Sequence, residues 1–324
     1  MMADATTVPP DTLRTIFEAM TRAHRVDERL RSMITSGQVF LIYYSPRGQE
    51  TVAAALAPLL RTDDYLVTNY RGIHDQIAKG IPLRPLLAEY FGKATGTCKG
   101  KGGPMHITHP ESGVMVTTGI VGAGLPIANG LALASKLRGT DQVTVATFGD
   151  GASNIGAFHE ALNLAAVWDL PVVFVCQNNQ WAEHTAITDS QRNANVADRA
   201  AAYGMPGVTV DGNDPVAMFT AAAAAVGRAR TGGGPTLLEA RTFRLCGHLV
   251  GDTMEYLPQD DLDAAVAADP VPRFRSWLLT TAGFAEDELA KIESAVDAEI
   301  DDAVEFAQTS PPPDADELNT DVYA

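Results

Sequence analysis

The sequence has little cysteine, no long apolar run and no excess of positive charge. Its three cysteines, Cys98, Cys176 and Cys246, form no Cys-x-x-Cys pair, which argues against a disulfide framework or a zinc site. No apolar run approaches the length of a membrane span, and residues 1–10 lack the basic and apolar regions of a secretory signal. The formal net charge of −16 argues against nucleic acid and anionic membranes as partners. We therefore expect a cytoplasmic protein.

The order of apolar patterns along the chain indicates its fold class. Hydrophobic residues make up 46% of the 324 residues, enough for a large core. Predicted strands alternate with predicted helices, which favours an α/β fold with a doubly wound parallel sheet and helices on both faces. We expect four parts: a polar end and helix (1–36), an α/β domain (37–259), acidic C-terminal helices (260–308) and an extended tail (309–324).

One predicted strand–helix–strand unit, residues 149–181 with the apolar run before it, carries the strongest functional signal. A β-branched run (VTVATF) ends in Gly-Asp-Gly, a second (LPVVFVCQ) ends in Asn-Asn, and apolar residues recur at helical spacing between them. A right-handed crossover brings both strand ends to one edge of the sheet, so Asp150 and Asn179 should lie side by side. A carboxylate and an amide oxygen are hard ligands that suit Mg²⁺ or Ca²⁺.

The glycines of the same unit indicate a phosphate group beside the metal. Mg²⁺ that is held by few protein ligands usually keeps phosphate oxygens in its coordination shell. Gly149 and Gly151 let the backbone approach a phosphate closely. A helix that begins after Gly151 would point its N-terminal amides at the same place.

Two other glycine-rich stretches do not fit nucleotide-binding motifs. Residues 119–124 carry the glycines of a dinucleotide fingerprint in the wrong order, with no clear strand before them. Residues 96–102 are one residue short of a P-loop and lack its Ser or Thr. The surrounding block, residues 92–113, is too irregular for a strand and too rich in glycine for a helix, so we expect a loop.

Several motifs in the same order resemble one known family. The chain is similar to the alpha subunit of the thiamine-diphosphate-dependent decarboxylating component of 2-oxo acid dehydrogenase complexes, of the pyruvate or acetoin type. The resemblance runs from about Met33 to the Pro-rich tail. The motifs that carry it are RGQE (Arg47 to Glu50), NYRG (Asn69 to Gly72), KGKGGPMH (Lys99 to His106), GIVGAG, the Gly-Asp-Gly to Asn-Asn unit, ADRAAAYGMPGVTVDG (Ala197 to Gly212) and FRLCGHLVGD (Phe243 to Asp252).

The resemblance implies a thiamine diphosphate and Mg²⁺ site within residues 37–259. Asp150 and Asn179 would ligate Mg²⁺ through side-chain oxygens, and Trp181 through its backbone carbonyl. Tyr70 and Arg71 match a pair that contacts the diphosphate, a role that suits a guanidinium fork.

The same resemblance assigns backbone roles near the cofactor. Backbone groups of Gly119 and Val121 would hold the aminopyrimidine ring, and the amide of Ala152 could reach the phosphate beside Gly149 and Gly151.

His248 is the candidate catalytic residue. It follows a predicted strand, stands between two glycines, and carries an imidazole that titrates near neutrality. The resemblance implies that it binds near the cofactor and assists acyl transfer to lipoamide. The roles of His74, His106 and His184 stay open. Leu249 occupies the place of a phosphorylated serine in animal pyruvate enzymes, so control at that position is not expected.

The resemblance also implies partners, because this chain has no stretch like the pyrimidine-binding domain that supplies the essential glutamate. We expect a beta subunit in an assembly of two alpha and two beta chains, and a lipoyl-bearing acyltransferase. The substrate implied is a 2-oxo acid, with pyruvate first. An acetoin dehydrogenase alpha subunit is the alternative, and a non-catalytic regulatory paralogue is an alternative of another class. The presence of Asp150, Asn179 and His248 argues against the paralogue.

Overall fold

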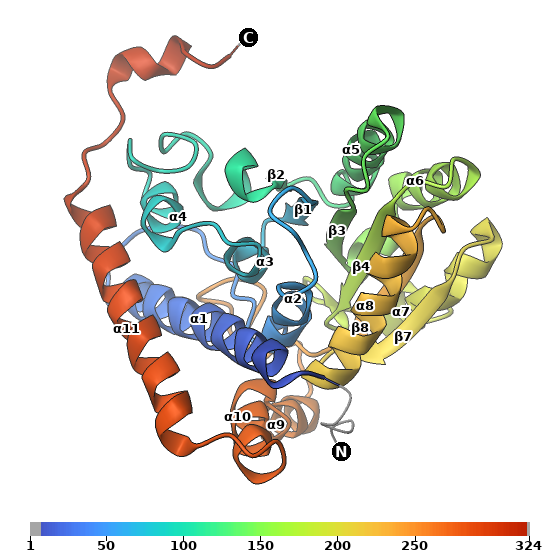
Figure 1. The fold of residues 1–324 in the computed structure, drawn as a ribbon. Helices are drawn as coiled ribbons and strands as arrows, with labels where there is room; N and C mark the ends of the chain where they lie inside the picture. The colour runs from blue at the N-terminus through green and yellow to red at the C-terminus, as the bar shows by residue number, and fades with distance from the viewer. Residues whose placement is uncertain (1–7, 323–324) are drawn as a thin grey trace.

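A six-stranded, wholly parallel sheet forms the centre of the computed structural model, which describes residues 8–322 (Figure 1). The predicted doubly wound parallel sheet is confirmed. The strand order is β2-β1-β3-β4-β8-β7. The strands are β1 (Tyr65–Asn69), β2 (Val114–Thr118), β3 (Thr144–Gly149), β4 (Val172–Asn178), β7 (Gly207–Asp211) and β8 (Thr236–Arg241); a separate hairpin pairs β5 (Trp181–Ala182) with β6 (Thr185–Ala186).

Helices cover both faces of this sheet (Figure 1). The α-helices within residues 8–322 are α1 (Pro10–Thr35), α2 (Glu50–Leu56), α3 (Ile73–Ala78), α4 (Leu83–Tyr90), α5 (Gly124–Arg138), α6 (Gly156–Val167), α7 (Ile187–Ser190), α8 (Pro215–Arg230), α9 (Gln259–Ala267), α10 (Pro270–Thr280) and α11 (Glu286–Thr309). None of the helices within residues 8–322 is long and apolar enough to cross a membrane.

Alternation along the central strands explains the two helical layers. In β3, Val145 packs into the core that α2, α3 and α8 share, whereas Ala146 and Phe148 pack into the core under α5 and α6. The two helical layers therefore pack on opposite faces of the same strands. The carboxyl ends of β1, β3 and β4 lie together at one edge of the sheet.

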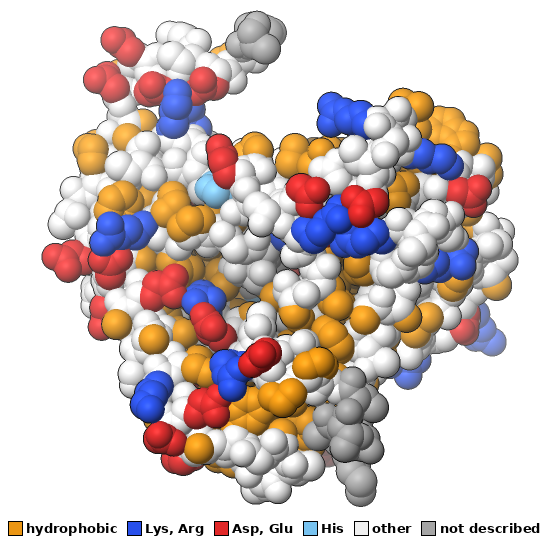
Figure 2. Space-filling model, viewed as in Figure 1, with side chains coloured by type: hydrophobic (Ala, Val, Ile, Leu, Met, Phe, Trp, Pro, Cys, Tyr) orange, Lys and Arg blue, Asp and Glu red, His pale blue; other side chains and the backbone are white. Residues whose placement is uncertain are grey.

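Outside the sheet layers, α1 and α11 lie side by side (Figure 1). Arg22 of α1 donates to Glu299 of α11 at 2.9 Å, and Arg14 donates to Glu288 at 2.6 Å. In Figure 2, acidic and basic side chains are interspersed over this part of the surface. Much of the excess negative charge therefore lies on a paired helix surface, as expected for a solvated face.

Three local predictions need correction. Residues 119–124 do follow a strand, because β2 pairs with β1 immediately before them. The chain after Gly151 first forms a 3₁₀ turn, Asp150–Asn154, and α6 begins only at Gly156. The tail is not extended throughout, since Ala315–Asn319 form a further 3₁₀ turn that Lys101 anchors to the glycine-rich loop.

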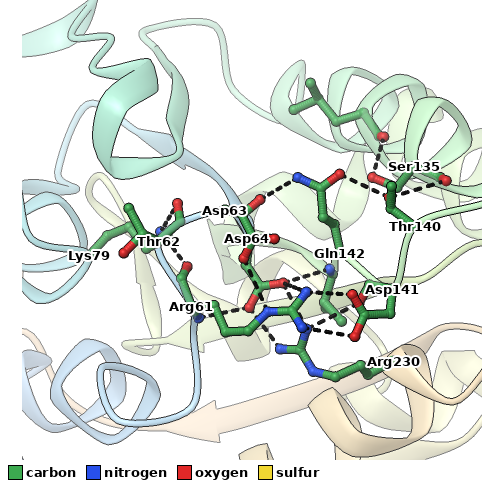
Figure 3. A network of polar contacts seen from close by, with 12 residues as sticks. Arg61, Thr62, Asp63, Asp64, Lys79, Ser135, Thr140, Asp141, Gln142 and Arg230 are labelled. Carbon is green, nitrogen blue, oxygen red and sulfur yellow. Dashed lines mark hydrogen bonds and ion pairs between the residues drawn. The ribbon is translucent and has the colours of Figure 1, made fainter. Parts of the chain in front are cut away.

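The opposite edge of the sheet is closed by a polar network (Figure 3). The buried carboxylate of Asp64 accepts from both terminal nitrogens of Arg230, at 3.0 and 2.7 Å, and from the amides of Arg61 and Val143. Nearby, Lys79 donates to the carbonyl of Arg61 at 2.9 Å and also to that of Ser112. These contacts fix the loops at the amino ends of β1, β2 and β3.

Candidate functional site

A cavity of about 400 Å³ opens at the carboxyl edge of the sheet, where parallel sheets bind ligands. Every predicted site residue lines it: Tyr70, Arg71, Gly119, Val121, Gly149, Asp150, Gly151, Ala152, Asn179, Trp181 and His248. These residues come from five separate segments, and the strand order brings them together.

The predicted metal pair lies where β3 and β4 end side by side. Gly149 pairs with Gln177 in the last register position, so Asp150 and Asn179 follow neighbouring strand ends. The side chain of Asp150 is buried, and its Oδ2 has no hydrogen-bond partner among the described residues. Burial raises the pKa of Asp150 to about 6. A buried carboxylate oxygen without a partner is suited to ligate a cation.

Asn179 and Trp181 form a tight turn beside this carboxylate. The Oδ1 of Asn179 accepts the backbone N–H of Trp181 at 3.1 Å, and its Nδ2 donates to Gln49 at 2.7 Å. No cluster of three His, Cys, Asp or Glu side chains suited to a metal exists within residues 8–322. A metal here would therefore need the amide and backbone oxygens that the sequence predicted.

Two buried arginines give the cavity a positive wall. Arg71 donates to the carbonyls of Ser45 at 2.7 Å and His248 at 3.0 Å, and Arg244 donates to the carbonyl of Glu183 at 2.7 Å. Within the described part of the chain, neither guanidinium forms an ion pair with a carboxylate. Buried cations without anionic partners favour an anionic ligand, such as a diphosphate.

His248 lies beside this arginine wall on the loop after β8. Its ring contacts Tyr44 edge-on, with the ring centres 5.1 Å apart, and lies near Tyr70. Burial, together with the charges of Arg71 and Arg244, lowers the pKa of His248 to about 4. The imidazole is therefore neutral at pH 7.

A chain of hydrogen bonds joins the His248 loop to the turn at Trp181. Asp252 accepts the backbone N–H of His248 at 2.6 Å and the hydroxyl of Tyr256 at 2.8 Å. Arg244 donates to the oxygen of Tyr256 at 2.6 Å and, as noted, to the carbonyl of Glu183. The two loops that flank the cavity are thus tied to each other.

The glycines of the cavity serve different purposes. A Cβ at Gly149 would meet nothing within 4 Å, so the backbone there is open to a ligand. At Gly151 it would lie 2.7 Å from the Cβ of Ala182, and at Gly122, where φ is +76°, it would lie 2.0 Å from Ile155. Gly151 and Gly122 are therefore required for packing of the cavity wall, whereas the sequence had predicted for Gly151 a close approach to a phosphate.

The three histidines with open roles lie in different settings. His74 is on α3, not in a loop, and it is buried with its Nε2 3.0 Å from the Oε1 of Gln177. His184 stacks on Tyr256, with ring centres 4.4 Å apart, outside the lining of the cavity. His106 is exposed and also outside the lining, although its ring approaches Gly119.

Sequence reasoning missed several residues of the cavity. Tyr44, Gln49, Gln177 and Arg244 all line it, and three of them lie in or beside motifs that were recognised. Gln49 stands in RGQE, Gln177 precedes Asn-Asn, and Arg244 stands in FRLCGHLVGD. Their position as polar residues in or beside recognised motifs was the signal that could have identified them as cavity residues.

The fold and the cavity define the class of protein: an α/β protein with a cavity suited to an anionic ligand and a cation at the carboxyl edge of a parallel sheet. Sequence comparison places it more narrowly. The chain belongs to the dehydrogenase E1 component family, whose profile matches residues 18–316. This family is thiamine-diphosphate-dependent and supplies the oxidoreductase component of 2-oxo acid dehydrogenase complexes.

Individual relatives match nearly the whole chain. The alpha subunit of acetoin:2,6-dichlorophenolindophenol oxidoreductase from Bacillus subtilis is 42% identical over 309 residues, which cover 95% of this chain and 92% of the relative. The protein of the same name from Cupriavidus necator is 40% identical, covering 99% and 97%. The alpha subunit of the pyruvate dehydrogenase E1 component from Porphyra purpurea is 36% identical, covering 96% and 93%.

Proposed function

We propose that this chain is the alpha subunit of a thiamine diphosphate- and Mg²⁺-dependent dehydrogenase that decarboxylates a 2-oxo acid. Pyruvate is the first candidate substrate. The acyl group passes to a lipoyl group of an acyltransferase component. A beta subunit completes the site, in an assembly of two alpha and two beta chains. The observation that carries this proposal is the buried Oδ2 of Asp150, which has no hydrogen-bond partner among the described residues, at the strand end beside Asn179.

In this proposal, each half of the cavity holds one part of the cofactor. Asp150, Asn179 and the carbonyl of Trp181 hold Mg²⁺, and Arg71 with Tyr70 provides the wall for the diphosphate. Gly149 and Ala152 present the backbone to phosphate, and Gly119 and Val121 present theirs to the aminopyrimidine. When bound, thiamine diphosphate supplies the nucleophilic carbon that attacks the substrate carbonyl.

The chain's own residues orient the ligand, and His248 can donate a proton in a hydrogen bond to it. His248 is neutral near pH 7 and one ring nitrogen faces Arg71, so the other nitrogen is left to donate to an oxygen in the cavity. Val121, with 49% of its surface exposed, lines the cavity, and Leu249, the residue after His248, is also exposed. These apolar residues suit coverage by a partner chain, which would exclude water.

Calorimetry of the alpha–beta pair with thiamine diphosphate and Mg²⁺ tests the cofactor assignment. Tight binding by the pair, and its loss in Asp150→Ala, is expected; Asp189→Asn, an exposed exchange, serves as the matched control. Absence of binding to the wild-type pair would favour the regulatory paralogue. Turnover of a 2-oxo acid by the alpha chain alone would contradict the requirement for a beta subunit.

Acetoin is the second candidate substrate. Two relatives with 42% and 40% identity are named as acetoin oxidoreductase subunits, against 36% for a pyruvate dehydrogenase subunit. Turnover of pyruvate, a branched 2-oxo acid and acetoin by the alpha–beta pair, with an artificial electron acceptor, separates the candidates. A rate with acetoin well above that with pyruvate would replace the first substrate assignment.

A further inference from the structure

Gln49 stands out among the cavity residues because the two polar atoms of its side-chain amide have different environments. Its side chain is 1% exposed and lines the cavity. Its Oε1 accepts the Nδ2–H of Asn179 at 2.7 Å, whereas its Nε2 has no partner among the described residues. A buried amide donor without a partner is costly unless a ligand supplies the acceptor.

The direction of both amides follows from a third residue. The backbone N–H of Trp181 can only donate, and it lies 3.1 Å from one amide atom of Asn179, so that atom must be the oxygen. The Nδ2 of Asn179 then faces Gln49, so the Gln49 atom that accepts this hydrogen bond must be Oε1. Any flip of either amide would place two donors against each other.

We propose that Gln49 is a positioning residue for the metal site: by accepting from Nδ2, it keeps the Oδ1 of Asn179 turned toward the bound cation. The proposal rests on the proposed function, since it takes Asn179 as a Mg²⁺ ligand. It also leaves the Nε2 of Gln49 as a donor toward the cavity, where an anionic oxygen would satisfy it.

The backbone that carries Gln49 is rigid, as a positioning role requires. The amide of Gln49 donates to the carbonyl of Pro46 at 2.9 Å, and the amide of Gly48 donates to the side chain of Glu50 at 2.8 Å. Gly48 has φ of +89°, and a Cβ there would lie 2.1 Å from the carbonyl oxygen of Phe243. The RGQE turn therefore packs closely against the segment that follows β8.

Two exchanges at Gln49 separate its roles. Gln49→Met removes the acceptor for the Nδ2 of Asn179, so the amide of Asn179 is held only by the N–H of Trp181 and is less firmly oriented toward the metal. Gln49→Glu keeps an acceptor of the same length and loses the donor. The matched control is Gln76→Met, because Gln76 is buried and hydrogen-bonded to Thr117 but does not line the cavity.

The experiment uses the alpha–beta pair with Mn²⁺ as the probe, followed by electron paramagnetic resonance at saturating thiamine diphosphate. Gln49→Met should raise the Kd for Mn²⁺ by about tenfold or more, as lost support of a metal ligand does. Gln49→Glu should restore the Kd to within about threefold of wild type or below it, and Gln76→Met should leave it unchanged on the same scale.

The outcomes separate this inference from the proposed function. A wild-type pair that binds neither Mn²⁺ nor the cofactor overturns the proposed function and this inference with it. A wild-type pair that binds both, with Gln49→Met within about threefold of its Kd for Mn²⁺, overturns this inference alone. Equal weakening by Gln49→Met and Gln49→Glu would also overturn it, because the retained acceptor would then be irrelevant.

Discussion

The guanidinium of Arg71 donates to the carbonyl of His248 at 3.0 Å and lies 3.4 Å from the Nδ1 of the same residue. Arginine carries only donors, so the Nδ1 that faces it must be unprotonated. The contact therefore selects the tautomer of His248 with its proton on Nε2. It also places a permanent positive charge beside an imidazole that is already partly desolvated.

Replacement of this arginine should raise the pKa of His248. In Arg71→Met, burial and Arg244 remain, so the pKa should rise from about 4 toward its ordinary value without reaching it. The pH titration of ring-labelled histidines by nuclear magnetic resonance would show this, with His248→Gln to assign the signal. Arg138→Met, at the exposed end of α5, is the control, and an unmoved titration in Arg71→Met would contradict the electrostatic account.

Asp150→Asn should stabilise the cofactor-free protein while it weakens metal binding. Because burial raises the pKa of Asp150 from 3.8 to about 6, ionisation opposes folding, and the penalty grows as pH rises from about 4 to 6. About two pKa units correspond to at most about 3 kcal/mol above pH 6. Thermal melts of the cofactor-free pair at pH 4 and pH 7.5 should show a gain at the higher pH only. A lower melting temperature for Asp150→Asn at pH 7.5 would be the contrary result.

The network of Figure 3 should make stability depend on acid through Asp64. Burial alone would raise the pKa of Asp64, but hydrogen bonds from Arg230 and two backbone amides outweigh it and hold the pKa below its ordinary value. The stabilisation is complete above the unfolded pKa of about 4 and is lost as pH falls through the lower folded value.

Arg230→Met removes both hydrogen bonds that the guanidinium donates to the buried carboxylate of Asp64 and leaves it the more distant Arg61, 3.8 Å away. The exchange should cost about 3 kcal/mol or more in the free energy of unfolding at pH 7. Arg84→Met breaks an exposed pair with Asp302 and should cost at most about 1 kcal/mol. Urea unfolding of both variants tests this difference. Equal costs would show that burial of the carboxylate is not the deciding factor.

Gly48→Ala and Gly80→Ala form a matched pair of backbone tests. Both glycines have φ near +90°, so alanine strains either one by about 1–2 kcal/mol. At Gly80 the new Cβ meets nothing within 4 Å, whereas at Gly48 it would lie 2.1 Å from a backbone oxygen. Gly48→Ala should therefore be clearly less stable by urea unfolding, and its cofactor affinity should fall because the RGQE turn must move. Similar losses in both variants would refute the close approach.

Local patterns were sufficient to predict the parallel sheet as a fold class and the ends of β3 and β4 that carry Asp150 and Asn179. Short β-branched runs, helical spacing between them and turn residues after them are all contained in one stretch of chain, and parallel crossovers have a fixed hand. The chain order of the motifs supported the rest of the predicted lining, and those residues do lie around one cavity. Their individual roles remain predictions.

Only the tertiary structure showed how that lining is held in place. β2 was missed because VMVTT becomes a strand by pairing with β1, which ends 45 positions before β2 begins. The contact of Gln49 with Asn179 joins positions 130 apart, and that of Arg71 with His248 joins positions 177 apart. Side chains at such separations meet through strand order and loop packing, which depend on burial over the whole core. The residue types at the strand ends thus come from sequence alone, whereas the partners that orient them come from the fold.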